Sequence, residues 1–448
     1  NDPEAAMASI TLTALPEAAA MEECSLRVHY AYQGQVIGRA FRDIRVLPAR
    51  QPVALPSHAA VPGVAAETPA TATSAGRIST ALVEAPVDIT LVIDEARPGS
   101  EMFWCYVLTP FDHLNQARTP RQRRLGDGRS AADFADLLMR TVEQQQKTAG
   151  VAESLTGLGD LIAGLLGDEI WQTVAAVARH VRDGLNREPT LLVFSTEYHI
   201  PWELARFQLD PDRPPFLGAQ VAMGRRFEPD SGDPDGPPMA SAIDVTEMAV
   251  VWSDYTGDRQ NDLLQAREEA HMLERMGAAS VPATGDGVAR VLGGGTPMDL
   301  LHFACHGRVR RTLGTAELSL EGGGLTLDSL RIRAARPVFE AERPFVFLNA
   351  CQVGQAVDVL SANLGVAATF LEVGSRACVA PLWSIDDGEA RDAVALFYQQ
   401  TLAEGVPVGV ALRKVRNRFR QGEQYRPTYL SYVYYGHPNL VLRKLERQ

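Results

Sequence analysis

From about residue 188 to its end, the sequence alternates between short apolar runs and segments with helical spacing. Short apolar runs between helical segments are typical of strands that helices cover on both faces. The pattern predicts an α/β fold, a three-layer αβα sandwich around a mostly parallel sheet. The expected strands are 191–194, 248–252, 300–304, 344–348 and 377–382, and the expected helices are 262–276, 286–292, 357–373, 387–404 and 408–420.

The first part of the chain has a different pattern, in which apolar and polar residues alternate at strand spacing. We expect a small β-rich, sandwich-like domain over residues 1–110. A stretch rich in Pro, Ala, Ser and Thr at about 50–78 indicates an insertion or linker with no packed core of its own. The expected strands are 25–30, 41–46, 87–93 and 103–108.

Helical spacing of apolar residues at 131–146 and again within 155–186 predicts a helical connecting region over residues 111–187. The α/β domain is then expected at 188–448. A length of 448 residues agrees with two or three domains, since one domain commonly holds about 150 residues.

Composition excludes several classes of function. The net charge of −12 argues against direct nucleic-acid binding and against binding to an anionic membrane surface. No run approaches the roughly 20 apolar residues of a membrane helix. The first residues, beginning at Asn1, show neither the basic segment nor the apolar segment of a signal peptide, so we expect a cytoplasmic protein with no membrane partner.

The five cysteines are odd in number and widely spaced, and they contain no CxxC pair. A disulfide framework or a structural zinc site is therefore not expected, and neither is any other metal or cofactor. A reducing compartment agrees with this pattern, and it leaves a thiol free for chemistry.

Two of the predicted strands end in chemically useful residues. The run at 300–304 leads to His306 and Gly307, and the run at 344–348 leads to Asn349 and Cys351. Because active residues of parallel sheets gather at the carboxyl ends of strands, two neighbouring strands of this kind bring an imidazole and a thiol together. The thiol has an ordinary pKa of about 8.5, and the imidazole can take its proton and later protonate a leaving amine.

The backbone at the same strand ends supplies a second element of such a site. Gly307 allows close approach of a substrate, and its N–H and that of Cys351 are the natural donors of an oxyanion hole. The alternative is a buried histidine beside an inert buried thiol. We assign that structural role to Cys305 and Cys378, which lie inside apolar strands, and to His302, expected to be a packed and hydrogen-bonded histidine.

Three motifs together resemble the CHAT-domain cysteine peptidases, which are grouped with caspases and separases in clan CD. They are the His306-Gly307 pair after an apolar strand, the sequence Asn349-Ala350-Cys351, and the segment 380–387 (APLWSIDD). The resemblance covers about residues 150–445, and the separation of 45 positions from His306 to Cys351 compares with about 50 in caspases. It implies a caspase-like fold, with His306 as general base, Cys351 as nucleophile and Gly307 in the oxyanion hole.

In the separase branch, an acid just past a Trp-containing strand helps to bind a basic P1 side chain. The matching positions here are Asp386 and Asp387. Asp387 is preferred because of the number of positions that separate it from Trp383 in the sequence. The alternative is that both belong to the acidic first turn of a helix, where the helix dipole favours them. Trp202 and Trp383 are expected to be core residues. A basic run at 413–420 is expected to form a solvated helix face.

The resemblance implies an endopeptidase that cleaves protein substrates through a Cys351 thioester. It also implies a latent enzyme awaiting an activating protein or signal, in a bacterial defence system such as antiviral defence or in a cell-death system. The alternative is a catalytically silent CHAT scaffold that binds partners. A weaker alternative is an acyl transferase that uses the same thioester.

Overall fold

The computed structural model describes most of the chain after residue 86 and one segment before it. The described residues are 24–44, 86–95, 99–126, 130–145, 148, 150–197, 199–227, 239–253, 264–293, 297–310, 315–321, 323–334, 342–352, 359–421 and 424–445. The Pro/Ala-rich stretch at 50–78 lies outside them. Residues 81–231 and 237–448 form a large compact unit.

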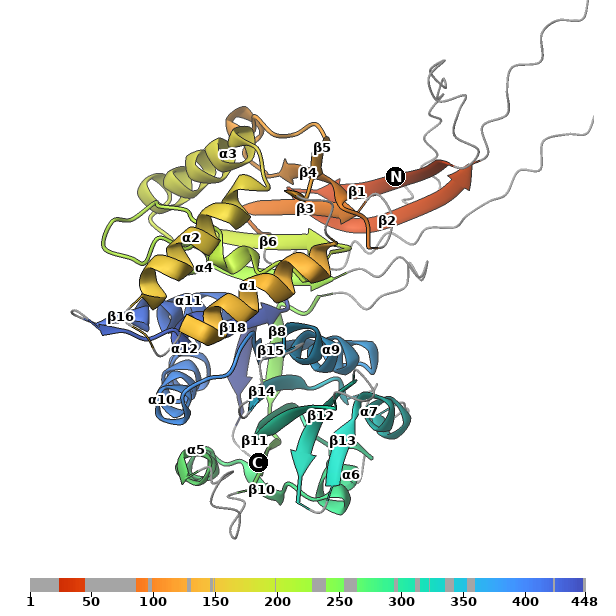
Figure 1. Ribbon diagram of the computed structural model, residues 1–448, viewed down its shortest axis with the longest axis vertical. Coiled ribbons are helices and arrows are strands. Elements are labelled where there is room, and N and C mark those ends of the chain that lie inside the picture. The colour runs from red at the N-terminus through yellow and green to blue at the C-terminus, as the bar shows by residue number, and fades with distance from the viewer. Residues whose placement is uncertain are drawn as a thin grey trace, which may run out of the picture. The chain divides into compact units, whose positions relative to one another are not determined.

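The large unit is built on one mixed sheet, which has 13 strands in the described part of the chain (Figure 1). Eleven of them follow one another in the order β10-β9-β11-β14-β15-β18-β7-β6-β3-β4-β5, and β12 and β13 extend from β11. The strands are β3 (Ile89–Glu95), β4 (Met102–Leu108), β5 (Arg121–Arg124), β6 (Thr190–Ser195), β7 (Ala222–Phe227), β9 (Met248–Trp252), β10 (Ala279–Pro282), β11 (Leu300–Arg310), β12 (Thr315–Leu320), β13 (Gly323–Thr326), β14 (Phe345–Gln352), β15 (Ala377–Pro381) and β18 (Tyr432–Tyr435).

Two parallel blocks of strands make up this sheet. Strands β10, β9, β11, β14 and β15 pair in parallel, and so do β18, β7, β6 and β3. The blocks meet at the antiparallel pair β15–β18, where Cys378 lies opposite Tyr435. The mostly parallel character predicted from the apolar runs is therefore confirmed.

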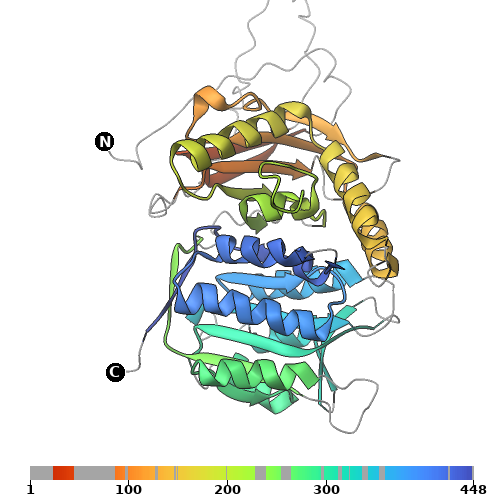
Figure 2. The same cartoon turned by 90° about the vertical axis from the view of Figure 1, so that its left-hand side faces the viewer.

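Helices cover both faces of the sheet. Figure 2 shows α5, α10 and α11 on one face, where they pack on a buried cluster that includes Phe347 and Phe397. On the other face α1, α2, α6 and α9 pack on a second cluster. The helices are α1 (Ala131–Gln145), α2 (Val151–Gly164), α3 (Asp168–Arg179), α4 (Leu217–Gln220), α5 (Leu264–Arg275), α6 (Gly285–Leu292), α7 (Leu327–Ala334), α9 (Val359–Glu372), α10 (Asp387–Tyr398), α11 (Val408–Arg416) and α12 (Thr428–Ser431).

Shorter elements complete the chain. A separate hairpin joins β1 to β2 through Gln33 and Gly34, both with positive φ, as a tight hairpin turn requires. Most of this hairpin belongs to a smaller compact unit. The remaining elements are β1 (Cys24–Tyr32), β2 (Gln35–Ile44), β8 (Ala242–Val245), β16 (Arg420–Gln421), β17 (Gln424–Tyr425), β19 (Val441–Lys444), the 3-10 turns η3 (Asp112–Leu114), η6 (Trp202–Leu204) and η8 (Asn417–Phe419), and the π-helical turns η5 (His180–Gly184) and η7 (Gln399–Ala403).

No single helix among the described residues has the length and apolar composition to cross a membrane. The segments Val151–Gly164 and Asp168–Gly184 meet that test only when taken together, and a bend of 105° separates them.

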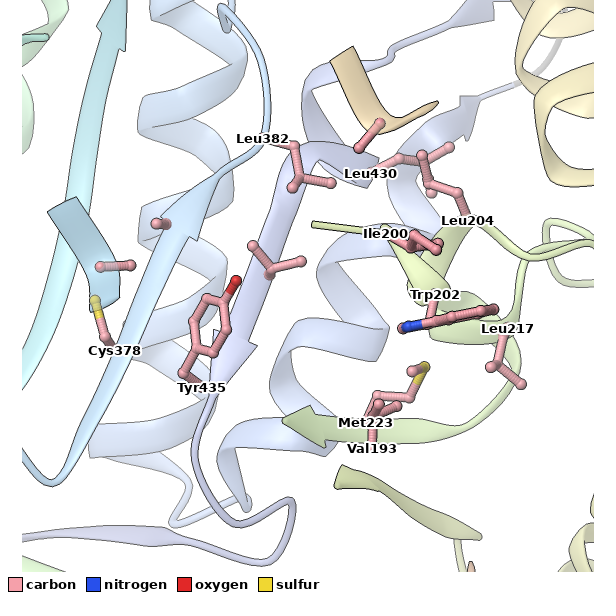
Figure 3. Packing of buried hydrophobic residues seen from close by; sticks show 14 of the residues in the cluster. Val193, Ile200, Trp202, Leu204, Leu217, Met223, Cys378, Leu382, Leu430 and Tyr435 are labelled. Carbon is pink, nitrogen blue, oxygen red and sulfur yellow. The ribbon is translucent and has the colours of Figure 1, made fainter. Parts of the chain in front are cut away.

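The two tryptophans expected in the core are fully buried. Trp202 lies in η6, and Figure 3 shows it among Ile200, Leu204 and Met223, while Leu382 and Tyr435 belong to the same cluster across the β15–β18 junction. One continuous core therefore spans both blocks of the sheet on this face.

The expectation of a solvated basic face at 413–420 is wrong for two of its arginines. Arg413 and Arg416 are 4% and 1% exposed. Arg416 donates to the backbone oxygens of Gly218 at 3.1 Å and Tyr432 at 2.8 Å, and burial lowers its pKa to about 10. Helix α11 packs on β7, and its Arg416 guanidinium satisfies buried carbonyl oxygens. Arg413 instead donates to the carboxylate of Glu188 at 2.9 Å.

The strands expected in a separate N-terminal sandwich do not all lie apart from the large sheet. Strand β3 pairs in parallel with β6, and β4 pairs with β3. All seven residues of β3 are buried, which a central strand of a covered sheet requires and a half-exposed sandwich strand does not. The domain boundaries at 110 and 187 remain predictions.

Candidate active site

The strands that carry His306 and Cys351 are neighbours in the sheet and run parallel. Their register pairs Leu300 with Phe345 at one end and Gly307 with Gln352 at the other, and it places His306 opposite Cys351. Backbones of adjacent strands are about 4.8 Å apart. The structure thus brings positions 306 and 351 side by side at the carboxyl ends of β11 and β14, although both side chains lie outside the described part of the structure.

Gly307 lies between two strands at this point. It is opposite Gln352 of β14 on one side and Leu318 of β12 on the other. An oxyanion donor needs an N–H that no neighbouring strand uses.

Both strands lose a neighbour shortly before these positions. The pairing of β11 with β9 ends at Ala304, and that of β14 with β15 ends at Phe347, within the described register. Beyond those points the two strands are paired with each other until β12 begins to pair at Gly307. The ends of β11 and β14 therefore depend more on side-chain contacts than the preceding residues of the same strands do.

A buried polar cluster supplies such contacts on one face of the strands. Glu269 of α5 accepts a hydrogen bond at Oε2 from Nδ2 of Asn349, at 2.7 Å, and its Oε1 is hydrogen-bonded to Nε2 of His302. Nδ1 of His302 lies 3.0 Å from Oη of Tyr398, and Tyr432 Oη donates to Oδ1 of Asn349 at 2.8 Å. Exposure of these five residues is between 0% and 8%.

The hydrogen bonds of this cluster connect its members, directly or through one intermediate residue, to the carboxylate of Glu269. The Asn349 amide and a His302 ring that carries its proton on Nε2 both donate to Glu269, and Tyr398 then donates to Nδ1. Burial, and secondly the charge of Glu269, raise the pKa of Tyr398 well above its usual range, so its phenol remains a donor. His302 also stacks on Phe347, with ring centroids 5.1 Å apart. The interpretation of His302 as a packed, hydrogen-bonded histidine is confirmed.

The two acidic candidates near the site have different surroundings. Asp386 is the N-cap of α10, and its Oδ1 accepts from the backbone N of Glu389 at 3.0 Å. Asp387 is half-buried, and its Oδ2 accepts from the backbone N of Gln265 at 3.1 Å, in the first turn of α5. Burial raises the pKa of Asp387, an effect that the backbone hydrogen bond opposes and the charge of Glu269 reinforces. The acidic helix turn considered in the sequence is therefore present, and Asp387 also reaches toward the site.

A small pocket joins Asp387 to the polar cluster. It has a volume of about 10 Å³, about enough for one water molecule. Its lining residues are Ala266, Glu269, Ala304, Asn349, Ile385, Asp387 and Ala390. Ala304 and Asn349 each lie two residues before positions 306 and 351, so the pocket borders the strand ends. In this state it is too small for a lysine or arginine side chain.

The other described thiols are buried. Cys305 and Cys378 are completely inaccessible, as expected for core residues, and Cys105 is 1% exposed. Burial raises the pKa of the Cys105 and Cys378 thiols, which disfavours thiolate at both positions.

Sequence patterns alone did not single out Glu269 or Tyr432. Glu269 sits in a charged stretch of α5, yet it falls on the buried stripe that also holds Ala266, Ala270 and Leu273. The sequence feature that could have identified Glu269 is a carboxylate at a position where the helical spacing predicts a buried apolar residue. Tyr432 offered no comparable signal, because its contact with Asn349 depends on the placement of β18.

Comparisons with known proteins give one family match. The CHAT domain family model matches residues 165–439. No curated protein matches the chain.

Among solved structures, the separase of the Saccharomyces cerevisiae separase–securin complex is 12% identical, with a TM-score of 0.43; the match covers 80% of this chain and 30% of that one. The Arg-specific cysteine proteinase gingipain R is 13% identical, with a TM-score of 0.40, over 70% of this chain and 75% of that one. The Porphyromonas gingivalis complex of RgpB pro- and mature domains gives the same identity and TM-score, over 70% of this chain and 77% of that one.

Proposed function

The chain belongs to the CHAT domain family, and from that premise we propose that it is a cysteine endopeptidase in which His306 and Cys351 form the catalytic pair. The observation that carries the proposal is the register of β11 and β14, which places the two positions directly opposite each other. A thiol and an imidazole at adjacent strand ends are the minimum that this chemistry needs.

The proposed reaction has two stages. His306 takes the proton of the Cys351 thiol, the thiolate attacks the carbonyl carbon of the scissile peptide bond, and His306 returns the proton to the departing amine as the C–N bond breaks. The resulting thioester is attacked by water, from which His306 removes a proton, and the acid product and free thiol are released. We assign stabilisation of the oxyanion to the backbone N–H groups of Cys351 and Gly307.

For specificity we propose a preference for a basic P1 side chain, with Asp387 as its partner. Asp387 lines the pocket beside the strand ends, whereas Asp386 is used as a helix cap. Since the pocket of about 10 Å³ cannot admit such a side chain without movement of its walls, we also propose a latent enzyme that an activating protein or signal opens. A regulated role in bacterial defence or cell death, in the cytoplasm, would fit latency.

Cleavage of a diverse peptide pool, read by mass spectrometry, tests the proposal with the wild type beside Cys351→Ala. Cleavage by the wild type alone, after basic residues, is the expected result for the activated enzyme, and no cleavage by either protein is the result that latency predicts before activation.

The small pocket also suits the alternative of a catalytically silent CHAT scaffold. A peptide electrophile separates the two, because labelling of Cys351 that disappears in His306→Ala requires an activated thiol. Labelling that is equal in both proteins would contradict an activated pair. Transfer of the acyl group to an added amine, in place of hydrolysis, would indicate an acyl transferase.

A further inference from the structure

We infer that Glu269 is a positioning residue for the proposed reaction. Its buried carboxylate connects His302 of β11 to Asn349 of β14 just before positions 306 and 351, and so fixes the spacing and alignment of the two strand ends. The inference rests on the proposed function, which needs those ends aligned, but it makes separate predictions about the strands themselves.

The place of the cluster along the strands is the first argument. Asn349 lies two residues after Phe347, the last β14 residue that pairs with β15, and His302 lies two residues before the last β11 residue that pairs with β9. The Asn349 side chain then contacts Glu269 on one side and Tyr432 of β18 on the other. The polar cluster therefore spans the stretch in which β11 and β14 lose their outer neighbours, and it ties the two strands to α5 and β18 there.

The convergence of elements on Glu269 is the second argument. One carboxylate, carried by α5, is joined through four hydrogen bonds to β11, β14, α10 and β18. A fully satisfied buried network of this kind has one preferred geometry, since each displaced member leaves a buried donor or acceptor unpaired. Catalysis is sensitive to such geometry, because a misplacement of about 1 Å can lower a rate about 100-fold.

A mild variant separates positioning from general stability. Tyr432→Phe removes the hydroxyl that holds Asn349, and Tyr434→Phe is its matched control, because Tyr434 is also fully buried on β18 and donates its hydrogen bond to the His437 backbone at 3.0 Å. We expect similar shifts of Tm for both variants. In peptide cleavage only Tyr432→Phe should lower kcat, about 3- to 10-fold, with KM changed less than about twofold, the size expected for one hydrogen bond. Equal kcat values in the two variants would overturn the inference.

A second pair of variants distinguishes geometry from charge. Glu269→Gln keeps the shape and one acceptor, and His302 can switch tautomer to accept from the new amide. We expect Glu269→Ala to lower kcat about 100-fold and Glu269→Gln to restore it to within about tenfold of the wild type. Glu268→Ala is the control, since Glu268 lies on the same helix in an exposed ion pair with Arg391 at 2.5 Å. If Glu269→Gln lowered kcat as much as Glu269→Ala does, the reaction would depend on the negative charge of Glu269, and the inference that Glu269 positions the strand ends would be overturned.

Hydrogen exchange keeps this test independent of turnover. If Glu269 and its partners hold the strand ends, amides at 349–352 exchange faster in Tyr432→Phe and in Glu269→Ala than in the wild type, and Tyr434→Phe leaves them unchanged. A wild type that cleaves no peptide is the result that latency predicts before activation, and equal electrophile labelling of wild type and His306→Ala would count against the proposed function. The exchange data would decide the inference in either case. Unchanged exchange at 349–352 in Glu269→Ala would overturn it.

Discussion

The substitution Asp387→Asn tests how the proposed enzyme recognises substrate, and its size can be worked from the structure. Asp387 is half-buried beside a pocket that Glu269, Asn349 and four apolar residues also line. A charge pair with a basic P1 side chain that is largely removed from water is worth about 2–5 kcal/mol when one partner is lost. Because Asp387 keeps some contact with solvent, we take the lower part of that range, about 2–3 kcal/mol, which corresponds to a loss of about 30- to 150-fold in kcat/KM.

The assay compares two fluorogenic peptides that differ only in P1, arginine or leucine. Asp387→Asn should lower kcat/KM for the arginine peptide by the stated factor and leave the leucine peptide within about twofold. Asp386→Asn is the control, since asparagine caps a helix as well as aspartate does. Equal losses for both peptides, or an equal effect of Asp386→Asn, would refute a specificity role for Asp387.

Three further predictions concern stability and thiol chemistry. Glu203→Gln should lower the free energy of unfolding by about 3–5 kcal/mol in urea denaturation, because it removes the carboxylate charge that faces the buried Arg225 guanidinium. A change below about 1 kcal/mol would contradict this. Burial lowers the pKa of His437 to about 4, from an ordinary value near 6.5, so the unfolded chain binds the proton first and stability falls as the pH drops from about 6.5 to 4, by about 3 kcal/mol in all. His437→Gln should flatten that part of the pH profile, and an unchanged profile would rule out His437 as its source. Native-state alkylation by iodoacetamide, read by peptide mapping, should modify Cys351 and leave the buried Cys305 and Cys378 unmodified. Modification of Cys305 or Cys378 at the rate of Cys351 would contradict this.

The parallel sheet could be predicted because its central strands are continuous apolar runs. The run at 300–304 lies within β11, the run at 344–348 begins one residue before β14, and the helical segments between the runs were also found. Strands β7 and β18 were not predicted. In β7, the charged residues Arg225 and Arg226 interrupt the apolar run. The charge of Arg225 is matched by Glu203, which lies 22 residues earlier, and no local pattern shows such a pair.

The candidate site could be predicted only in part, because some of its contacts join residues that are far apart in the sequence. His306 and Cys351 stand at the ends of apolar runs, which a single pass along the sequence can find. The Glu269 cluster joins residues that lie 33 and 80 positions apart from Glu269, and its members look like ordinary surface or core residues in isolation. Only the register of the strands and the phase of α5 show that they meet.

The place of β3 in the sheet bears on how this protein can be trimmed. The family match begins at residue 165, but β6 has β3 as its neighbour on one side, and all six residues of β6 are buried. A chain cut back to residues 165–448 would keep every residue discussed for catalysis and yet turn β6 into an open edge. Open edges of apolar strands pair with other molecules, so such a fragment should aggregate. The segment from β3 to β5 protects the sheet that holds the site.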